Sequence, residues 1–175
     1  NRITFGGPDK IHVHPISISP EMKDSLQKRL LMFFTGLSRD SFEITPEQVR
    51  ATERNEAALR AMLVMVDEGE KILKNPPDWL DNFGRLMHET WMLKRGLTES
   101  ISNSKIDEIY ERARHAGAIG GKLLGAGGGG CILLFVKPED HNNVREKIKL
   151  LNQNIVEIPF KFENSGSQII YFQET

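Results

Sequence analysis

The sequence predicts an α+β fold, in which a mostly antiparallel sheet carries helices packed on one face. Strand-like segments stand at both ends of the 175-residue chain and in its middle. Stretches with apolar residues at helical spacing separate these segments. A buried apolar run directly follows a stretch that holds eight of the fifteen glycines. We therefore expect helices to cover a sheet built from distant parts of the chain.

The composition is that of a globular domain with balanced charge. Lys and Arg number 23 against 24 Asp and Glu, for a net charge of −1, which indicates neither nucleic-acid binding nor an anionic membrane partner. No apolar run is long enough to span a bilayer, and no signal peptide opens the sequence. Cys131 is the single cysteine, which excludes a disulfide framework and a Cys-based zinc site. We expect a cytoplasmic, reducing compartment.

The first segments predict a hairpin. Residues 2–5 and 11–19 are rich in β-branched residues, and the Gly-Gly-Pro-Asp sequence at 6–9 is turn chemistry. Because strand-like sequence starts at the first residue, we expect the chain to begin inside a larger protein.

A short helix and a buried strand are expected next. Ser19 is a good N-cap and Pro20 suits the first helical position, so the helix runs to about Arg29. Residues 30–34 are wholly apolar and predict a strand.

Three helices are predicted in the middle of the chain. The first starts at Thr45-Pro46-Glu47 and carries one apolar stripe to about Lys74. Residues 75–78 end it and begin a second helix, which reaches Arg95. The third spans about 104–116.

The last part of the chain returns to strands. Residues 131–136 predict a buried strand, and Pro138 opens a helix to about Leu151. Residues 156–162 and 168–172 predict a final pair of strands.

The glycine stretch from Gly117 to Gly130 is the strongest candidate for a site. Glycine loses more backbone entropy on folding than any other residue, so such a run needs positive φ values or a close approach to a neighbour. Consecutive N–H groups without side chains can also cradle phosphate oxygens. The alternative is a glycine bulge or tight packing of a helix on a strand.

Other glycine loops fit this stretch poorly. Residues 125–130 satisfy G-x-G-x-x-G, but the dinucleotide motif requires a following helix, and 131–136 is a strand. A Walker A loop requires Ser or Thr after Gly121-Lys122, where Leu123 stands. The downstream lysine strand and catalytic loop of protein kinases are also absent.

Metal and nucleophile chemistry have little local support. His88-Glu89 begins the H-E-x-x-H pattern, but Met92 replaces its second histidine. His12 and His14 share a strand face without a third ligand in view, which favours a solvated face. Cys131 is expected to be a buried small hydrophobe. We predict no metal ligands and no catalytic residue in this chain.

Residues 122–131, Lys-Leu-Leu-Gly-Ala-Gly-Gly-Gly-Gly-Cys, resemble the third, C-terminal motif of the GHMP small-molecule kinases. Residues 31–39 resemble that family's strand ending in a Thr-Gly turn and a basic residue. Residues 88–95 are similar to a helix of its heptose kinases, which act on D-glycero-D-manno-heptose 7-phosphate. Residues 1–5 resemble the start of the family's domain-crossing sheet.

The resemblance implies the C-terminal half of an ATP-dependent sugar kinase, most like the heptose 7-phosphate branch, with a ferredoxin-like fold. Residues 1–19 would continue from a missing N-terminal domain, and 20–175 would form the GHMP kinase C-terminal domain. The family's ATP loop and catalytic Asp are not in this sequence, so ATP and Mg²⁺ would be held mainly by the missing half. We expect the isolated chain to be inactive, and to self-associate through an exposed strand edge.

The resemblance also implies site residues, each with a structural alternative. The loop from Gly125 to Gly130, including Ala126, would close on the ATP phosphates and the acceptor. Thr35, Arg39 and Ser41 would approach the substrate or the γ-phosphate, or else form a solvated loop that begins a helix.

A second group of candidates lies on one helix. His88, Trp91 and Arg95 share a helix face and could bind a sugar phosphate, although Trp91 also continues an apolar stripe. Lys122 could contact phosphate, or it could be an exposed lysine on a short strand.

Two functions from different classes remain. The first is half of a kinase that transfers the ATP γ-phosphate to a hydroxyl of a sugar or sugar phosphate. The second is a non-catalytic α+β module that binds a small ligand or partner and keeps the glycine loop as a scaffold. A Rossmann-type oxidoreductase would require a helix after Gly130.

Overall fold

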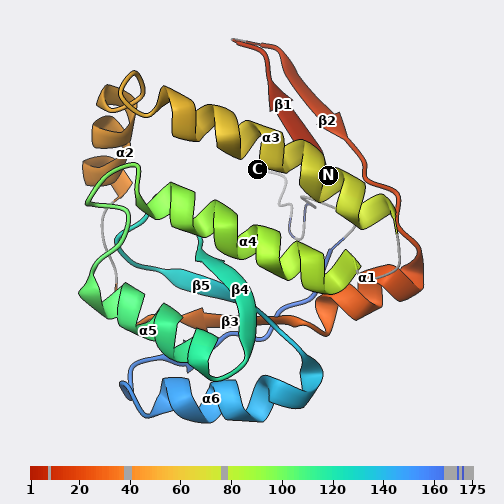
Figure 1. The fold of residues 1–175 in the computed structure, drawn as a ribbon, viewed down its shortest axis with the longest axis vertical. Helices are drawn as coiled ribbons and strands as arrows, with labels where there is room; N and C mark the ends of the chain where they lie inside the picture. The colour runs from red at the N-terminus through yellow and green to blue at the C-terminus, as the bar shows by residue number, and fades with distance from the viewer. Residues whose placement is uncertain (8, 38–40, 76–78, 164–168, 170, 172–175) are drawn as a thin grey trace.

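The computed structural model describes residues 1–7, 9–37, 41–75, 79–163, 169 and 171, with the backbone alone for 41–45. The helices and strands follow one another as β1 (Arg2–Phe5), β2 (Ile11–His14), α1 (Pro20–Gln27), β3 (Leu30–Phe34), α2 (Ser41–Arg50), α3 (Glu56–Lys74), α4 (Trp79–Arg95), α5 (Ser104–His115), β4 (Ala118–Leu123), β5 (Cys131–Val136), the 3₁₀ turn η1 (Pro138–Asp140), α6 (His141–Lys149) and β6 (Val156–Glu157). Figure 1 shows their arrangement.

A four-stranded antiparallel sheet with the order β4-β5-β3-β6 forms the centre of the fold. Leu134 of β5 lies opposite Leu31 of β3 on one side and opposite Gly121 of β4 on the other. The apolar run 131–136 is therefore an interior strand, which explains why it lacks polar alternation. The α+β class and the antiparallel sheet are confirmed.

Helices α5 and α6 cover one face of this sheet. Phe33, Leu134 and Val136 pack there with Ile106 of α5 and Ile148 of α6, and each of these five side chains is at most 1% exposed. The expected packing of helices on one face of the sheet is thus observed for α5 and α6.

The opposite face carries a smaller apolar cluster. Phe135 packs there with Leu26 of α1 and Trp79 of α4, with contributions from α3. Because successive side chains of β5 point to opposite faces, this interior strand brings helices to both of them.

Two glycines allow α4 to lie directly on β4. A Cβ atom added at Gly120 would stand 1.9 Å from the carbonyl oxygen of Gly84, and one added at Gly84 would stand 2.6 Å from Cδ1 of Phe135. Any larger residue at either position would push the helix away from the strand. Part of the glycine stretch therefore serves packing inside a six-residue strand, as the structural alternative proposed.

The prediction of one helix from residue 46 to 74 is wrong. α2 already begins at Ser41 and includes Pro46, and residues 51–55 form turns before α3 begins at Glu56. Buried Ala51 and the bond from Asn55 Nδ2 to the Leu97 carbonyl oxygen (2.7 Å) fix this break. These tertiary contacts stabilise a break that no Pro or Gly marks in the sequence.

The other element boundaries differ in smaller ways. The second strand ends at His14, before Pro15, and β6 spans only two residues before the chain reaches Pro159. The helix expected from Pro138 is a 3₁₀ turn followed by α6. The strand predicted at 168–172 lies largely outside the described residues.

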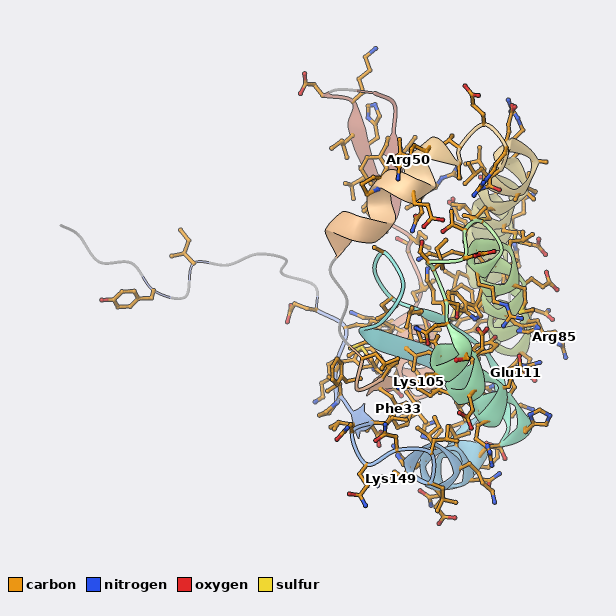
Figure 2. All side chains as sticks on the ribbon, turned by 90° about the vertical axis from the view of Figure 1, so that its left-hand side faces the viewer. Phe33, Arg50, Arg85, Lys105, Glu111 and Lys149 are labelled. Carbon is orange, nitrogen blue, oxygen red and sulfur yellow. The ribbon has the colours of Figure 1, made fainter. Side chains whose placement is uncertain are left out.

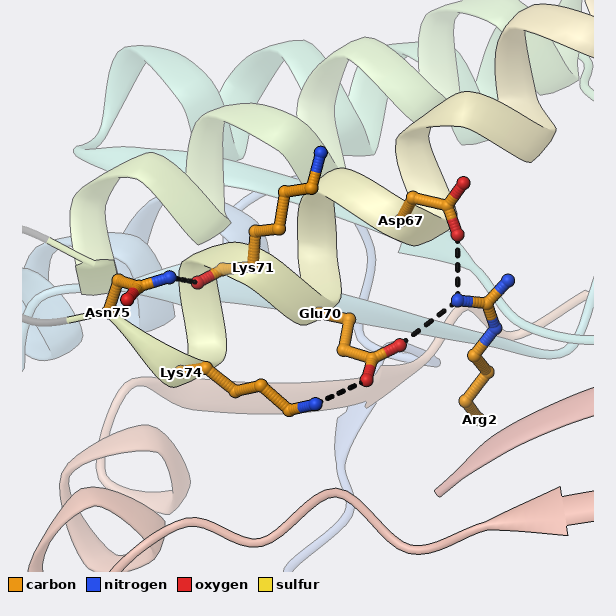
Figure 3. Close-up of polar contacts among 6 residues, drawn as sticks. All are labelled: Arg2, Asp67, Glu70, Lys71, Lys74 and Asn75. Atoms are coloured by element: carbon orange, nitrogen blue, oxygen red, sulfur yellow. Dashed lines mark hydrogen bonds and ion pairs between the residues drawn. The ribbon is translucent and has the colours of Figure 1, made fainter.

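The β1–β2 hairpin stands apart from the main sheet and is tied to α3. Nη1 of Arg2 lies 2.7 Å from Asp67 and 3.1 Å from Glu70, as Figure 3 shows. On the other face, Ile3 pairs with Val13 and Phe5 with Ile11. These four apolar side chains are 51–73% exposed.

Candidate functional site

The loop from Gly125 to Gly130 is the connection between the adjacent antiparallel strands β4 and β5. The register pairs Leu123 with Ile132, and the amide of Leu124 donates to the carbonyl oxygen of Cys131 (2.8 Å). A strand therefore follows the loop, as predicted. The loop does not lead into a helix whose N-terminus could bind a phosphate.

Four carbonyl oxygens of this loop accept hydrogen bonds from side chains of four other segments. The donors are Lys94 Nζ to Gly125 (2.9 Å), Gln48 Nε2 to Ala126 (2.8 Å), Asn103 Nδ2 to Gly128 (3.2 Å) and Thr35 Oγ1 to Gly130 (2.8 Å). Each of these bonds turns a partial negative charge of the loop toward the protein. The surface of the loop that is left for a ligand therefore carries mainly the partial positive charge of its N–H groups.

Only two loop amides donate to the described part of the protein. The amide of Gly128 donates to Ile101 O (3.0 Å) and that of Gly130 to Leu37 O (2.8 Å). Among the described residues, the other four amides, from Gly125 to Gly127 and at Gly129, have no acceptor. Backbone donors of a folded loop require water or a ligand when the protein offers no partner.

Glycine is required in this loop for two different reasons. A Cβ atom at Gly127 (φ 129°) would lie 2.7 Å from Cα of Ile101, and one at Gly129 would lie 2.7 Å from Leu37 O. Gly125 (φ 79°) instead faces open space, with nothing within 4 Å of an added Cβ atom. The buried glycines thus serve packing, whereas Gly125 leaves the backbone accessible.

Two lysines lie beside the loop. Lys94, in the last turn of α4, holds the Gly125 carbonyl, and Lys122 precedes the loop on β4. Burial lowers the pKa of Lys94 below its ordinary value, and the charge of Lys122 lowers it further. The two ammonium groups therefore interact, which sequence spacing alone did not reveal.

The predicted substrate residues after β3 are only partly described. Thr35 is 2% exposed, and its hydroxyl donates to Gly130 O while accepting from the amide of Leu37 (3.3 Å). It therefore positions the loop from beneath. Arg39 lies outside the described residues, and Ser41 is described only as the first residue of α2.

His88, Trp91 and Arg95 share a helix face, as predicted, and that face is directed toward α5. Nδ1 of His88 lies 2.7 Å from the hydroxyl of Tyr110, and Trp91 is 1% exposed against the same ring. Arg95 pairs with Asp107 at 3.3 Å. This geometry favours the core-packing alternative for Trp91.

Burial shifts both members of the His88–Tyr110 contact toward their neutral forms. It lowers the pKa of His88 and raises the pKa of Tyr110 to about 12. A neutral pair shares one hydrogen bond, whose direction depends on the tautomer of the imidazole. This contact joins α4 to α5 and contributes to fixing the helix that carries Lys94.

A groove of about 540 Å³ lies between α3, α4 and the sheet. Its walls are mostly apolar, and its charged lining residues are Arg2, Glu70 and Lys122. The volume is in the range of small-molecule sites.

Within the described residues, no group of three or more His, Cys, Asp or Glu could hold a metal ion. A search of the same residues finds no helix with the length and apolarity needed to cross a bilayer.

Comparisons with known proteins all indicate the same family. Residues 79–152 match the family described as GHMP kinases C terminal. This range contains α4, α5, β4, the glycine loop, β5 and α6.

Two curated relatives extend the similarity over most of the chain. The bifunctional fucokinase/GDP-fucose pyrophosphorylase of Arabidopsis thaliana is 31% identical over 156 residues, which are 87% of this chain and 14% of that protein. The D-glycero-alpha-D-manno-heptose 7-phosphate kinase of Campylobacter jejuni is 27% identical over 152 residues, 85% of this chain and 44% of that protein. The chain thus spans less than half the length of either relative.

A solved structure shares the fold. The mevalonate kinase of Methanococcus jannaschii superposes with a TM-score of 0.61 at 27% identity, over 85% of this chain and 43% of that one.

Proposed function

The chain belongs to the GHMP kinases, whose C-terminal domain it contains, and from this premise we propose that it closes the reacting site of an ATP-dependent small-molecule kinase. The glycine loop would contact the phosphate in transfer, and the acceptor would be a sugar or sugar phosphate. The division expected from the sequence is kept, with residues 1–19 continuing from a preceding kinase half and 20–175 forming this domain.

One observation carries this proposal. Side chains hold four loop carbonyls, while four loop amides lack a partner among the described residues. A loop with this arrangement attracts anions through its unpaired N–H groups. Its carbonyl oxygens repel an anion less, because they already accept hydrogen bonds from the protein. Hydrogen bonds fix the donors before a ligand binds, so little reorganisation would be needed when charge develops on a phosphate.

The chemistry assigned to the bound nucleotide is phosphoryl transfer. The acceptor hydroxyl oxygen bonds to the γ-phosphorus, the bond to the β–γ bridging oxygen breaks, ADP leaves with that electron pair, and a base outside this chain takes the hydroxyl proton. The residues of this chain would orient the phosphate through the unpaired loop amides, of which those of Gly125 and Ala126 belong to residues that are not buried. Thr35, Gln48, Lys94 and Asn103 would keep those amides in place.

Other parts of the enzyme would supply what this chain lacks. The proposal places the ligands of Mg²⁺, most ATP contacts and the base in a preceding kinase half, so the 175 residues alone should not turn over ATP. The exposed apolar side chains of the β1–β2 hairpin would be covered by that half, or by self-association when it is missing. We also propose a cytoplasmic location, since a sequence with a single cysteine has no internal disulfide.

The acceptor class rests on the relatives. The fucokinase and the heptose 7-phosphate kinase favour a sugar, and the heptose phosphate is the acceptor that we propose first. The fold similarity to a mevalonate kinase makes mevalonate the necessary competitor in any assay.

A panel of acceptors tests the proposal on the full-length protein. We expect ATP-dependent phosphorylation of a sugar or sugar phosphate, measured as ADP release and by mass spectrometry of the product. Turnover of mevalonate alone would refute the sugar assignment and keep the family. Absence of turnover with every acceptor would favour a non-catalytic binding module.

A matched pair of glycine variants tests the role of the loop. Gly125→Ala and Gly7→Ala both place a methyl group at positive φ with nothing within 4 Å. Both should therefore destabilise the fold similarly, by about 1–3 kcal/mol. Only Gly125→Ala should raise the KM for ATP or lower kcat, because only that methyl group would meet the phosphate. Equal kinetics in the two variants would remove the loop from the site.

A further inference from the structure

Lys94 and Lys122 both lie near the start of the glycine loop, and Lys122 also lines the apolar groove. On α4, Met87 and Thr90 line the groove, and Lys94 follows Thr90 by four residues, so it continues the same helix face toward Gly125. On β4, Lys122 lines the groove together with Leu133 of β5, opposite which it lies in the register. One helix position and one strand position thus bring two lysines to the place where the loop begins, one of them on the groove wall and the other on the Gly125 carbonyl.

No acidic side chain balances this pair within the described part of the chain. Arg2 and Glu70, the other charged residues of the groove, pair with each other at 3.1 Å, and Glu70 also binds Lys74. Neither Lys94 nor Lys122 forms an ion pair with a described carboxylate, and Lys94 donates to a carbonyl oxygen instead. Two lysines without a carboxylate partner beside an apolar groove offer charge-assisted hydrogen bonds to an anion.

We propose that Lys94 and Lys122 form a subsite for a fixed phosphate group of the acceptor, at the loop end of the groove. This inference rests on the proposed function and sharpens it: the enzyme would select phosphorylated acceptors over neutral sugars. The unpaired loop amides would hold the phosphate in transfer, and the lysine pair would hold the phosphate that stays on the acceptor.

The position of Lys122 assigns this phosphate to the acceptor rather than to ATP. Lys122 lines the groove, whose volume suits a molecule of sugar size. The amides that would meet the transferred phosphate belong to the loop beyond it. The lysines and the loop amides thus form two neighbouring subsites. They match an acceptor that reacts at one end and carries its own phosphate at the other.

The test is steady-state kinetics of Lys122→Gln in the full-length protein. The acceptors are a heptose 7-phosphate, the same heptose without phosphate, and fucose. We expect the KM for the phosphorylated acceptor to rise about tenfold or more, which is the loss of one charge-assisted hydrogen bond. The KM for ATP should stay unchanged, and Lys122→Arg should recover most of the lost affinity. Lys94→Gln should raise the same KM and also lower kcat, because it releases the Gly125 carbonyl.

Lys149→Gln is the matched control. Figure 2 shows Lys149 on α6, at the end of the molecule opposite Arg50 of α2, and α2 is the helix that contacts the loop through Gln48. This substitution removes the same charge without touching the groove. It should change neither KM value.

Other outcomes would overturn the inference. A rise in the KM for ATP alone would assign the lysines to the donor. Equal use of phosphorylated and neutral acceptors, with no effect of Lys122→Gln, would leave a kinase without this subsite. If no acceptor is turned over, NMR of the lysine ammonium groups during titration with inorganic phosphate decides separately. Selective shifts at Lys94 and Lys122 would support the subsite although the kinase proposal fails, and their absence would overturn it.

Discussion

Two glycine-containing hairpin connections in this molecule have opposite surroundings. The β1–β2 turn is closed by its own backbone, with Gly6 N donating to Lys10 O and Lys10 N to Gly7 O. The β4–β5 loop receives hydrogen bonds from α2, α4, the end of β3 and the segment before α5. The glycines at 127, 128 and 129 in the loop are buried, whereas those of the turn are exposed.

The difference shows that glycine content alone does not make a site. Positive φ values occur in both connections, at Gly7 and Asp9 in one and at four glycines in the other. Amides without an acceptor among the described residues occur in both connections, at Gly7 and Asp9 as well as in the loop. Only in the loop do side chains of other segments fix the carbonyl groups. Preorganisation by the surroundings therefore separates a candidate phosphate loop from an ordinary turn.

The largest expected contrast comes from the same substitution in both connections. Gly127→Ala and Gly7→Ala have similar φ values of 129° and 116°, but only the first added methyl group would meet a backbone atom, at 2.7 Å. Strain alone should cost each variant about 1–3 kcal/mol, and overpacking should add about 1–3 kcal/mol to Gly127→Ala. Urea unfolding measures both values. Equal losses would show that the loop is no more constrained than the turn.

Thr35→Val should have the next largest effect. The substitution keeps the shape of a 2% exposed side chain but removes the hydroxyl that donates to Gly130 O and accepts from Leu37 N. The backbone amide of Thr35 still donates to Gly130 O (2.9 Å), but the Leu37 amide loses its acceptor, which should cost about 1–3 kcal/mol in the free energy of unfolding. Thr35→Ser retains the hydroxyl and should recover the polar part of that loss. A Thr35→Val protein as stable as Thr35→Ser would contradict a tethered loop.

The contact that holds α4 should respond to pH. Burial lowers the pKa of His88 in the folded state, so as pH falls the unfolded chain binds the proton first. Stability from this group is therefore complete above the ordinary histidine pKa near 6.5 and is lost as pH falls through that value toward the lower folded pKa. Unfolding of the wild type and His88→Gln, compared between about pH 7.5 and 5, measures the difference.

Tyr110→Phe separates the two possible causes of this dependence. Burial is the main cause of the lowered His88 pKa, so the slope should persist when the tyrosine hydroxyl is removed. Loss of the slope in Tyr110→Phe would instead assign it to the hydrogen bond.

The anchor of the hairpin should give the smallest effect and respond to salt instead. Arg2 bridges Asp67 and Glu70 on the surface of α3 (Figure 3), and exposed ion pairs contribute little and are screened. Arg2→Gln should lower Tm slightly at low ionic strength and leave it unchanged at about 1 M NaCl. A large, salt-independent loss would show that the hairpin is as firmly held as the loop.

Local chemistry sufficed to predict several elements correctly. Ser19 caps α1 by accepting from Met22 N (3.2 Å), as its position before Pro20 indicated. The apolar strands β3 and β5 and the helix α5 also follow from their patterns. In each case the signal lies within the segment that it describes.

The features that the sequence did not reveal depend on distant residues. Gly120 and Gly121 lie in a strand although glycine disfavours strands, because Gly84, from a different element, lies against Gly120. The break between α2 and α3 depends on a bond from Asn55 to Leu97. Lys94 lies within the predicted group on α4, but helical spacing does not reveal its contact with Gly125.

The loop joins strands that neighbour each other in the main sheet, and this has a mechanical consequence. Displacing its amides would break the hydrogen bonds that four side chains donate to its carbonyl oxygens. It would also break those that two of its own amides donate to Ile101 and Leu37. The loop therefore has no hinge of its own. Within the proposed function, a phosphate would meet a loop whose backbone is already held in place.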